Sequence, residues 1–189
     1  PLDSVLNHAE YEKLKGSLTG LAIRRGYFDA DMEKSQLGVS LDNHASYWDF
    51  VFNSGERYRF GKVNYTGSQI REDYLQNIVP FKEGEYYSSE DLAEFNRRLA
   101  ATGWFNSAVV TPNIAKARSE GNYLLPMDAV VTPRSRNYMA LGGGFATDVG
   151  PRLNMQWDKP WINSRGHSLT SNMSISKPEQ SIGANYKIP

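Results

Sequence analysis

The chain has 189 residues, and 40% of them are hydrophobic, so it is long and apolar enough to fold into one or two domains. Its 21 Lys and Arg balance 21 Asp and Glu, which excludes a global field that would attract nucleic acid or anionic lipid. The absence of cysteine excludes disulfides, thiolate metal sites and cysteine nucleophiles, and it fits an oxidising periplasm.

The first part of the chain predicts two helices and then two strands. A short helix is expected near Asp3, and a longer one from about Glu10 to a stop at Gly26. Two β-rich segments follow at about 27–41 and 46–53, with turn residues between them.

The same order then recurs in a second set of elements that begins with its own strand. Its polar start Ser88-Ser89-Glu90-Asp91 is typical of a helix N-terminus. The expected elements are a strand at 58–65, a short helix at 69–78, a helix from 88 to 103, and strands at 104–114 and 123–133 joined by the polar stretch 116–122. Its expected core is Val63, Tyr65, Leu75, Ile78, Leu92, Phe95, Leu99, Trp104, Phe105, Val109, Val130 and Val131.

An internal repeat supports this organisation. Residues 26–30, Gly-Tyr-Phe-Asp-Ala, match residues 103–107, Gly-Trp-Phe-Asn-Ser, at an offset of 77. Glycine commonly follows a helix end because it adopts positive φ without strain, and the aromatic pair is expected to fix the last turn. The surrounding order of helix, helix, strand, strand indicates two copies of one module.

The chain changes character from residue 137 onward, where helical patterns give way to strict alternation. Strands are expected at about 152–158, 167–176 and 181–188, with turn residues between them. The alternating apolar residues are Leu153, Met155, Trp157, Leu169, Met173, Ile175, Ile182, Ala184, Tyr186 and Ile188. A transmembrane β-barrel has this pattern, and so does a soluble sheet with one buried face. Small polar residues opposite, and aromatic residues such as Trp161 near strand ends, favour the membrane.

Candidate chemistry is sparse. His8, His44 and His167 lie in different segments, and no zinc-binding spacing connects them. The glycine-rich run from Gly142 to Gly144 lies inside a strand pattern, so it indicates a bend or a weak strand rather than a phosphate loop. We expect no enzymatic activity, no cofactor and no metal site.

Four motifs, at 60–67, 147–152, 159–163 and 166–169, together with the two helix-end motifs, resemble outer-membrane insertases of the BamA/TamA-type superfamily. The first looks like the opening strand of a polypeptide-transport-associated (POTRA) module, and the others look like the first barrel hairpins of the TamA branch. The resemblance implies an α+β fold, with tandem POTRA modules (β-α-α-β-β) followed by the N-terminal antiparallel strands of a transmembrane β-barrel.

The implied boundaries are 1–54 for a POTRA module lacking its first strand, 55–136 for a complete module, and 137–189 for about four barrel strands. We therefore expect the chain to be a fragment, in which 55–136 can fold alone while 137–189 needs lipid or further strands.

The resemblance also implies a function and partners. The implied function is the assembly of autotransporters and other β-barrel clients at the outer membrane, with the modules in the periplasm. The implied partners are unfolded outer-membrane β-barrel clients, outer-membrane lipid and an inner-membrane-anchored, TamB-like protein. Two alternatives stay open: a two-partner secretion transporter of the same superfamily, and a soluble periplasmic chaperone or binding module that acts by strand addition.

Two strands are the candidate sites. The resemblance maps the first barrel strand, which forms a lateral seam, onto Tyr138, Met139, Ala140, Leu141, Gly142, Gly143, Gly144, Phe145, Ala146 and Thr147. The candidate edge for strand addition is Trp104, Phe105, Asn106, Ser107, Ala108, Val109, Val110 and Thr111.

Overall fold

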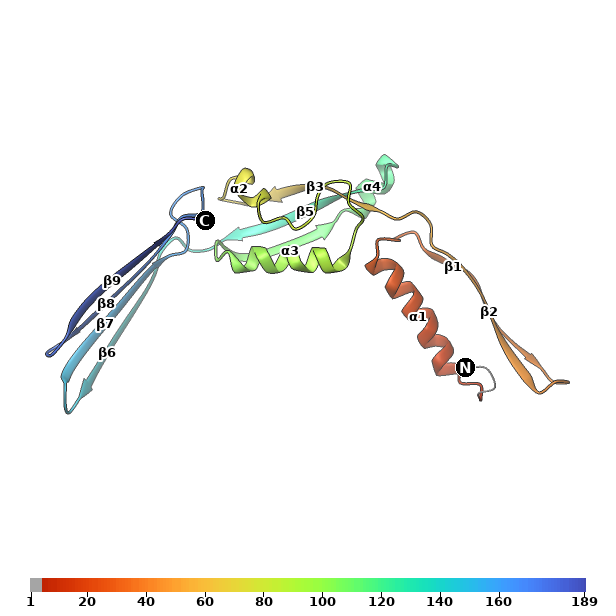
Figure 1. The fold of residues 1–189 in the computed structure, drawn as a ribbon, viewed down its shortest axis with the longest axis horizontal. Coiled ribbons are helices and arrows are strands. Elements are labelled where there is room, and N and C mark those ends of the chain that lie inside the picture. The colour runs from red at the N-terminus through yellow and green to blue at the C-terminus, as the bar shows by residue number, and fades with distance from the viewer. Residues whose placement is uncertain (1–4) are drawn as a thin grey trace. The chain divides into compact units, whose positions relative to one another are not determined.

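A computed structural model describes residues 5–189 and contains four helices and nine strands in that range. The helices are α1 (His8–Arg24), α2 (Glu72–Gln76), α3 (Ser89–Ala101) and α4 (Ile114–Glu120). The strands are β1 (Asp31–Ser40), β2 (Ala45–Asn53), β3 (Arg59–Thr66), β4 (Phe105–Pro112), β5 (Leu124–Pro133), β6 (Tyr138–Ala146), β7 (Gly150–Lys159), β8 (Ser168–Ser176) and β9 (Gln180–Lys187) (Figure 1).

The structure divides into two compact units. The first comprises residues up to 62 together with 81–93 and 112–127, and the second comprises 63–80, 94–111 and 128–189. None of the helices in the described range is long and apolar enough to cross a membrane.

In the first unit, α1 accompanies the antiparallel hairpin of β1 and β2. The helix begins after Asn7, whose side chain accepts a hydrogen bond from the Ala9 amide and caps the first turn. Tyr11 is buried and stacks on Phe50 of β2 at 5.2 Å between ring centroids. Tyr11 and Ala22 are the buried residues of α1, whereas Leu14, Leu21 and Ile23 are exposed.

Strands β3, β5 and β4 form a three-stranded sheet in that order, so β5 is central and β4 is an edge strand. β5 alternates strictly, and its inward residues Leu125, Met127, Ala129 and Val131 are buried. Gly61 of β3 lies so close to β5 that an added Cβ would approach the Leu125 carbonyl oxygen to 2.6 Å. The close approach of the two strands therefore requires glycine at this position.

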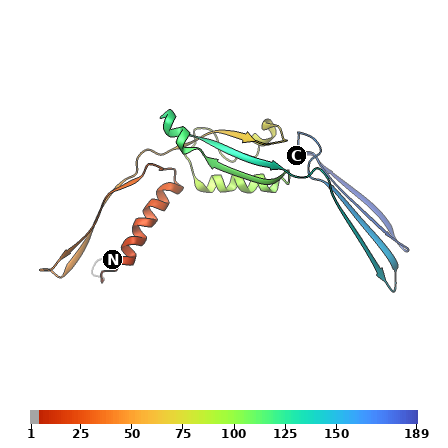
Figure 2. The same ribbon diagram turned by 180° about the vertical axis from the view of Figure 1, so that it is seen from behind.

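The four strands β6 to β9 form a separate antiparallel sheet in chain order, and Figure 2 shows them side by side. β6 pairs with β7 in continuous register from Tyr138 opposite Asp158 to Ala146 opposite Gly150. The glycine-rich run therefore neither bulges nor slips, so the bend, one of the two sequence interpretations, is not observed. The other interpretation, a weak strand, stays a prediction. No residue of these four strands is buried.

One helix was not expected. The sequence predicts Ile114 as the end of a strand and 116–122 as a polar connection, but Ile114 and residues 116–120 belong to α4. The Asn113 side chain accepts from the Lys116 amide at 3.0 Å, which caps the helix. Gly121 follows at φ +67 and closes it in the left-handed conformation. The alanines between them favour the helix, so local capping outweighs the polar composition.

Other differences concern element ends and burial. Residues 5–7 are not helical, and Asp3 lies outside the described residues, so the short first helix is not observed. The strand expected from residue 27 begins only at Asp31. Seven expected core residues are buried, whereas Val109 and Val130 are each 56% exposed. Both valines lie on the outward side of their strands, which the apolar sequence pattern did not distinguish.

Candidate functional site

The segment that follows α1 packs against Tyr58, the residue just before β3. The Gly26 carbonyl accepts a hydrogen bond from the Tyr58 amide at 2.8 Å. Phe28 lies edge-on between Tyr58 and Tyr87, with ring centroids 5.5 and 5.0 Å away. Gly26 has φ +88, and an added Cβ would lie 2.9 Å from the Tyr87 Cβ. We call this contact the first joint, and its glycine is required by both conformation and space.

An ion pair reinforces the first joint. Asp29 accepts from the Tyr58 hydroxyl at 2.6 Å and from Arg118 Nε of α4 at 2.8 Å. The Tyr58 hydrogen bond, and then Arg118, hold the pKa of the Asp29 carboxyl below its ordinary value. Burial, with the neighbouring carboxylate, raises the pKa of the Tyr58 hydroxyl. Asp29 is therefore charged, and Tyr58 neutral, throughout the neutral pH range.

The second copy of the helix-end motif makes an equivalent contact with the loop between β7 and β8. The Trp104 indole donates to the Gly166 carbonyl at 2.9 Å in a buried hydrogen bond. The Trp104 carbonyl accepts from the Gln69 side chain at 2.7 Å and from the Arg134 amide at 3.0 Å. A further backbone bond joins the Arg71 amide to the Ser164 carbonyl at 3.0 Å. We call this contact the second joint.

No residue larger than glycine fits at position 166 in the second joint. It has φ +78, and an added Cβ would lie 2.3 Å from the Trp104 ring. The loop therefore sits directly on the indole. Because the strands on both sides of this loop belong to the four-stranded sheet, Trp104 fixes the end of that sheet to the module.

The two joints share another repeated feature that the sequence reasoning missed. Arg59 and Arg136 are 77 residues apart, the same offset as the helix-end motifs, and each also has an arginine two positions before it. Arg59 lies over the Tyr86 ring at 4.0 Å, and Arg136 lies over the Trp161 ring at 4.8 Å. Extending the comparison at offset 77 past each last strand reveals this Arg-x-Arg pattern.

The four-stranded sheet has one apolar and one polar face. The register places these residues on the apolar face: Met139, Leu141, Gly143 and Phe145 of β6, Pro151, Leu153, Met155 and Trp157 of β7, Leu169, Ser171, Met173 and Ile175 of β8, and Ile182, Ala184 and Tyr186 of β9. Ile182 is 80% exposed and Phe145 is 76% exposed. An apolar surface this large and uncovered marks contact with a membrane or another protein.

The opposite face carries polar and small residues. Gln156, Asn172 and Gly183 lie side by side across β7, β8 and β9. The surface is hollowed along this row, between Gln156, Thr170 and Asn185. A face of this kind suits water, as in the lumen of a barrel.

Both strands singled out from the sequence lie at sheet edges. β6 is the first strand of the four-stranded sheet, and β4 is an edge of the three-stranded sheet. The predicted seam ends one residue later than β6, at Thr147, and the predicted strand-addition segment begins one residue before β4, at Trp104. Trp104 itself is buried and committed to the second joint. The roles of the two edges stay predictions.

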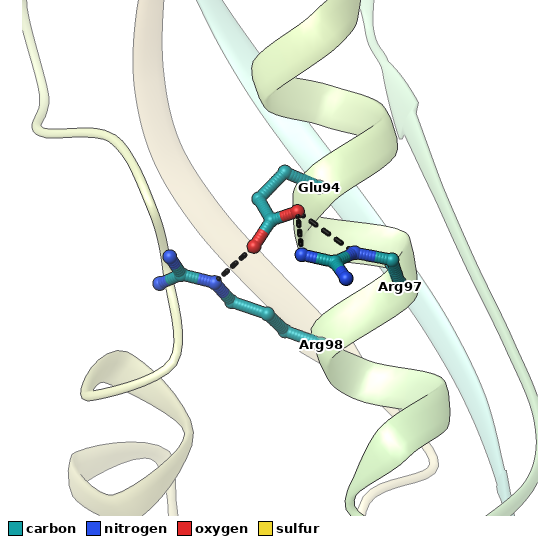
Figure 3. A network of polar contacts seen from close by, with 3 residues as sticks. All are labelled: Glu94, Arg97 and Arg98. Atoms are coloured by element: carbon teal, nitrogen blue, oxygen red, sulfur yellow. Dashed lines mark hydrogen bonds and ion pairs between the residues drawn. The ribbon is translucent and has the colours of Figure 1, made fainter.

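The titratable groups of the described range do not converge on a reactive centre. On α3, Glu94 accepts hydrogen bonds from Arg98 at 2.8 Å and from Arg97 at 2.9 and 2.5 Å (Figure 3). The hydrogen bond from Arg98, and then those from Arg97, lower the pKa of the Glu94 carboxyl. The network is exposed and is typical of a solvated helix surface. No group of three or more metal-binding side chains is present in residues 5–189.

Comparison with known proteins identifies the fold. Residues 58–132 match the POTRA family, described as surface antigen variable number repeat. The chain is similar to BamA from Haemophilus ducreyi lacking POTRA domains 1–3, with TM-score 0.73 and 16% identity over 98% of this chain and 34% of that chain. It is also similar to CdiB from Escherichia coli, with TM-score 0.54 and 14% identity over 97% of this chain and 34% of that chain.

These comparisons confirm the predicted fold class. The chain is an α+β protein in which the region matching the POTRA family is followed by antiparallel strands, a fold similar to that of BamA. It spans about a third of the length of the solved structures it resembles. At identities under one fifth the likeness concerns the fold, and the domain boundaries drawn from the sequence stay predictions.

The first joint should weaken in acid. A carboxyl whose pKa is lowered by folding stabilises the folded state above its unfolded pKa of about 3.9, and this contribution is lost as pH falls through the folded value. We expect Asp29→Asn to reduce the free energy of unfolding at pH 7 by about 1 kcal/mol and to remove part of the acid sensitivity. Thermal melts from pH 7 to pH 3 measure both effects. Asp31→Asn, which removes a neighbouring charge outside the joint, is the control and should leave the acid sensitivity intact.

Adding one methyl group at position 166 should disrupt the second joint. Gly166→Ala combines positive φ with a clash against the Trp104 indole, so we expect a loss of at least about 2 kcal/mol and faster hydrogen exchange at the Gly166 loop. Gly121→Ala is the matched control, because Gly121 also has positive φ but has no atom within 4 Å of an added Cβ. Equal effects of the two substitutions would mean that backbone conformation alone, and not the Trp104 contact, makes glycine necessary at 166.

Proposed function

We propose that the protein containing this chain assembles other proteins into the outer membrane of a Gram-negative bacterium, or carries them across it. The POTRA domain lies in the periplasm, and β6 to β9 form the first strands of a transmembrane barrel. The observation that carries the proposal is the four-strand register, which gathers the exposed apolar residues onto one face. Contact of apolar side chains with water is unfavourable, and contact with lipid avoids this free-energy cost.

The second joint supports this assignment. A membrane strand must leave the bilayer where its chain meets the periplasmic module. Trp104 and Gly166 make that connection directly, between the last turn of the module's helical part and the loop linking β7 to β8. In the proposed arrangement, this loop lies at the periplasmic side of the membrane. The turns at the other end of the sheet face outward from the cell.

Within this class, we propose a TamA-like assembly factor, an outer-membrane subunit that works with an inner-membrane-anchored partner of the TamB type. The motifs at 147–152 and 159–163 support the finer assignment, since they resemble the first barrel hairpins of the TamA branch. The substrates are unfolded β-barrel clients, autotransporters among them. β6 is the strand that opens toward the bilayer: the resemblance maps the first barrel strand onto it, and it lies at one edge of the four-stranded sheet.

The glycines of β6 keep the seam weak. Gly142, Gly143 and Gly144 have no side chains to contact a strand across the seam, and glycine lowers the stability of strand pairing. An added Cβ at Gly143 has as its nearest neighbour the Arg152 carbonyl oxygen at 3.9 Å, so larger residues fit there. The three glycines are therefore not required by packing within the described sheet.

A two-partner secretion transporter is the second candidate. The similarity to CdiB supports it, at TM-score 0.54. The similarity to BamA, at TM-score 0.73, favours the assembly factor. Periplasmic strand addition fits either candidate, because β4 is an edge strand and its Val109 side chain is 56% exposed.

The seam proposal predicts that Gly143→Val slows client insertion. Valine favours paired strands and faces lipid at this position, so it should tighten the seam without disturbing the fold. The measurement is the rate at which a β-barrel client inserts into liposomes containing the full-length protein, and we expect a several-fold decrease. Ala184→Val adds apolar bulk to the same face on β9, away from the seam, and should leave the rate unchanged. A well-folded Gly143→Val protein that inserts clients at the normal rate would contradict the role of the glycines.

A further inference from the structure

The four-stranded sheet is charged at one end. Residues 134–189 contain seven Lys and Arg against three Asp and Glu, whereas the whole chain is neutral. Five of the basic residues lie at the end next to the second joint: Arg134, Arg136, Lys159, Arg165 and Lys187. One acidic residue, Asp158, accompanies them. At the opposite end two basic residues, Arg152 and Lys177, are balanced by Asp148 and Glu179.

Two of these cations lie on tryptophans. Lys159 Nζ is 4.9 Å from the centre of the Trp157 ring, and the Arg136 guanidinium is 4.8 Å from the Trp161 ring. Arg136 also donates one hydrogen bond to the Ile162 carbonyl, at 3.0 Å. Within residues 5–189, no carboxylate forms an ion pair with either cation. Both charges are thus held in place by aromatic rings while their polar ends stay available to an anion.

The same end of the apolar face carries amphipathic residues. The register aligns Lys159, Leu169 and Tyr186 in one row across β7, β8 and β9. The Tyr186 hydroxyl is 2.6 Å from His167 Nδ1, so the hydroxyl has a hydrogen-bond partner outside this row of residues. Tryptophan, tyrosine and lysine in this arrangement are typical of the boundary between hydrocarbon and headgroups, where lysine extends its ammonium toward the headgroups.

From this arrangement we propose that Arg136 and Lys159 form a headgroup site for an anionic phospholipid in the leaflet on the module side. The site rests on the membrane location proposed above and adds a lipid specificity to it. Guanidinium and ammonium groups bind the lipid phosphate and its additional negative charge, while the acyl chains lie along Met155 and Leu169. A zwitterionic headgroup carries its own cation, so it gains less from the two side chains.

A site at this position anchors the second joint to the bilayer. Arg136 belongs to the segment that follows the POTRA domain, and Lys159 precedes the loop that contacts Trp104. One lipid held between them contacts both chain segments that leave the membrane toward the module. Lipid composition therefore affects the anchoring of the module.

The test uses the full-length protein in phosphatidylcholine liposomes that contain a photoactivatable phosphatidylglycerol or, separately, a photoactivatable phosphatidylcholine. Crosslinks to peptides within 134–169 are quantified by mass spectrometry, and the ratio of the two lipids is the readout. We expect a preference for phosphatidylglycerol of roughly fivefold for each cation. Arg136→Gln with Lys159→Gln should abolish it, and Lys159→Arg should retain it.

The charge-matched control is Arg152→Gln with Lys177→Gln, which removes one arginine and one lysine from the other end of the same sheet. It should leave the preference unchanged. Equal crosslinking of both lipids in the wild-type protein would overturn the headgroup site while leaving the membrane location standing. Equal loss of preference in the control variant would also overturn it, since net charge would then explain the binding. The absence of crosslinks to either lipid would overturn the membrane location as well.

Discussion

Strand pairing decides what the C-terminal part of this chain requires from its surroundings. Alternating side chains place apolar residues on one side of each strand, and the register of β6 to β9 aligns those sides. A shift of one residue in any pair would move a whole strand's apolar residues to the polar face. Because no residue of the four strands is buried, the sheet cannot satisfy its own apolar surface. Lipid on one face and water on the other meet this requirement, and the proposed function and headgroup site both depend on it.

The joints explain how such a sheet connects to the POTRA domain that precedes it. Each copy of the repeated motif ends a helix at a glycine with positive φ and then presents aromatic rings to the next part of the chain. Phe28 contacts two tyrosines of the following module, and Trp104 contacts the loop at Gly166. The same helix-end motif therefore contacts two different parts of the chain. The arginines that follow each module at the same offset add cation–aromatic contacts beside both joints.

The periodic parts of the fold were predictable from the sequence, and the contacts between them were not. Alternation in 152–158 and the cap signals before α3 reflect local constraints, and the structure has both elements in the expected places. The helix α4 escaped prediction because its signals, the Asn113 cap and Gly121, lie in a short polar stretch. The partners of Trp104 and Asp29 are 62 and 89 residues away in the chain, so only tertiary structure brings them together. The two copies of the helix-end motif were visible in the sequence, but the residues that each copy contacts were not.

The central claim, that the apolar face of β6 to β9 contacts lipid, is tested most directly by cysteine scanning along β7. The described chain contains no cysteine, so Leu153→Cys, Asn154→Cys, Met155→Cys and Gln156→Cys can be labelled individually in a full-length protein free of other cysteines. Reconstituted in vesicles and treated with a water-soluble maleimide, cysteines at 154 and 156 should react rapidly, and those at 153 and 155 should be protected. Equal reaction at all four positions, or protection at 154 and 156 instead, would contradict the account.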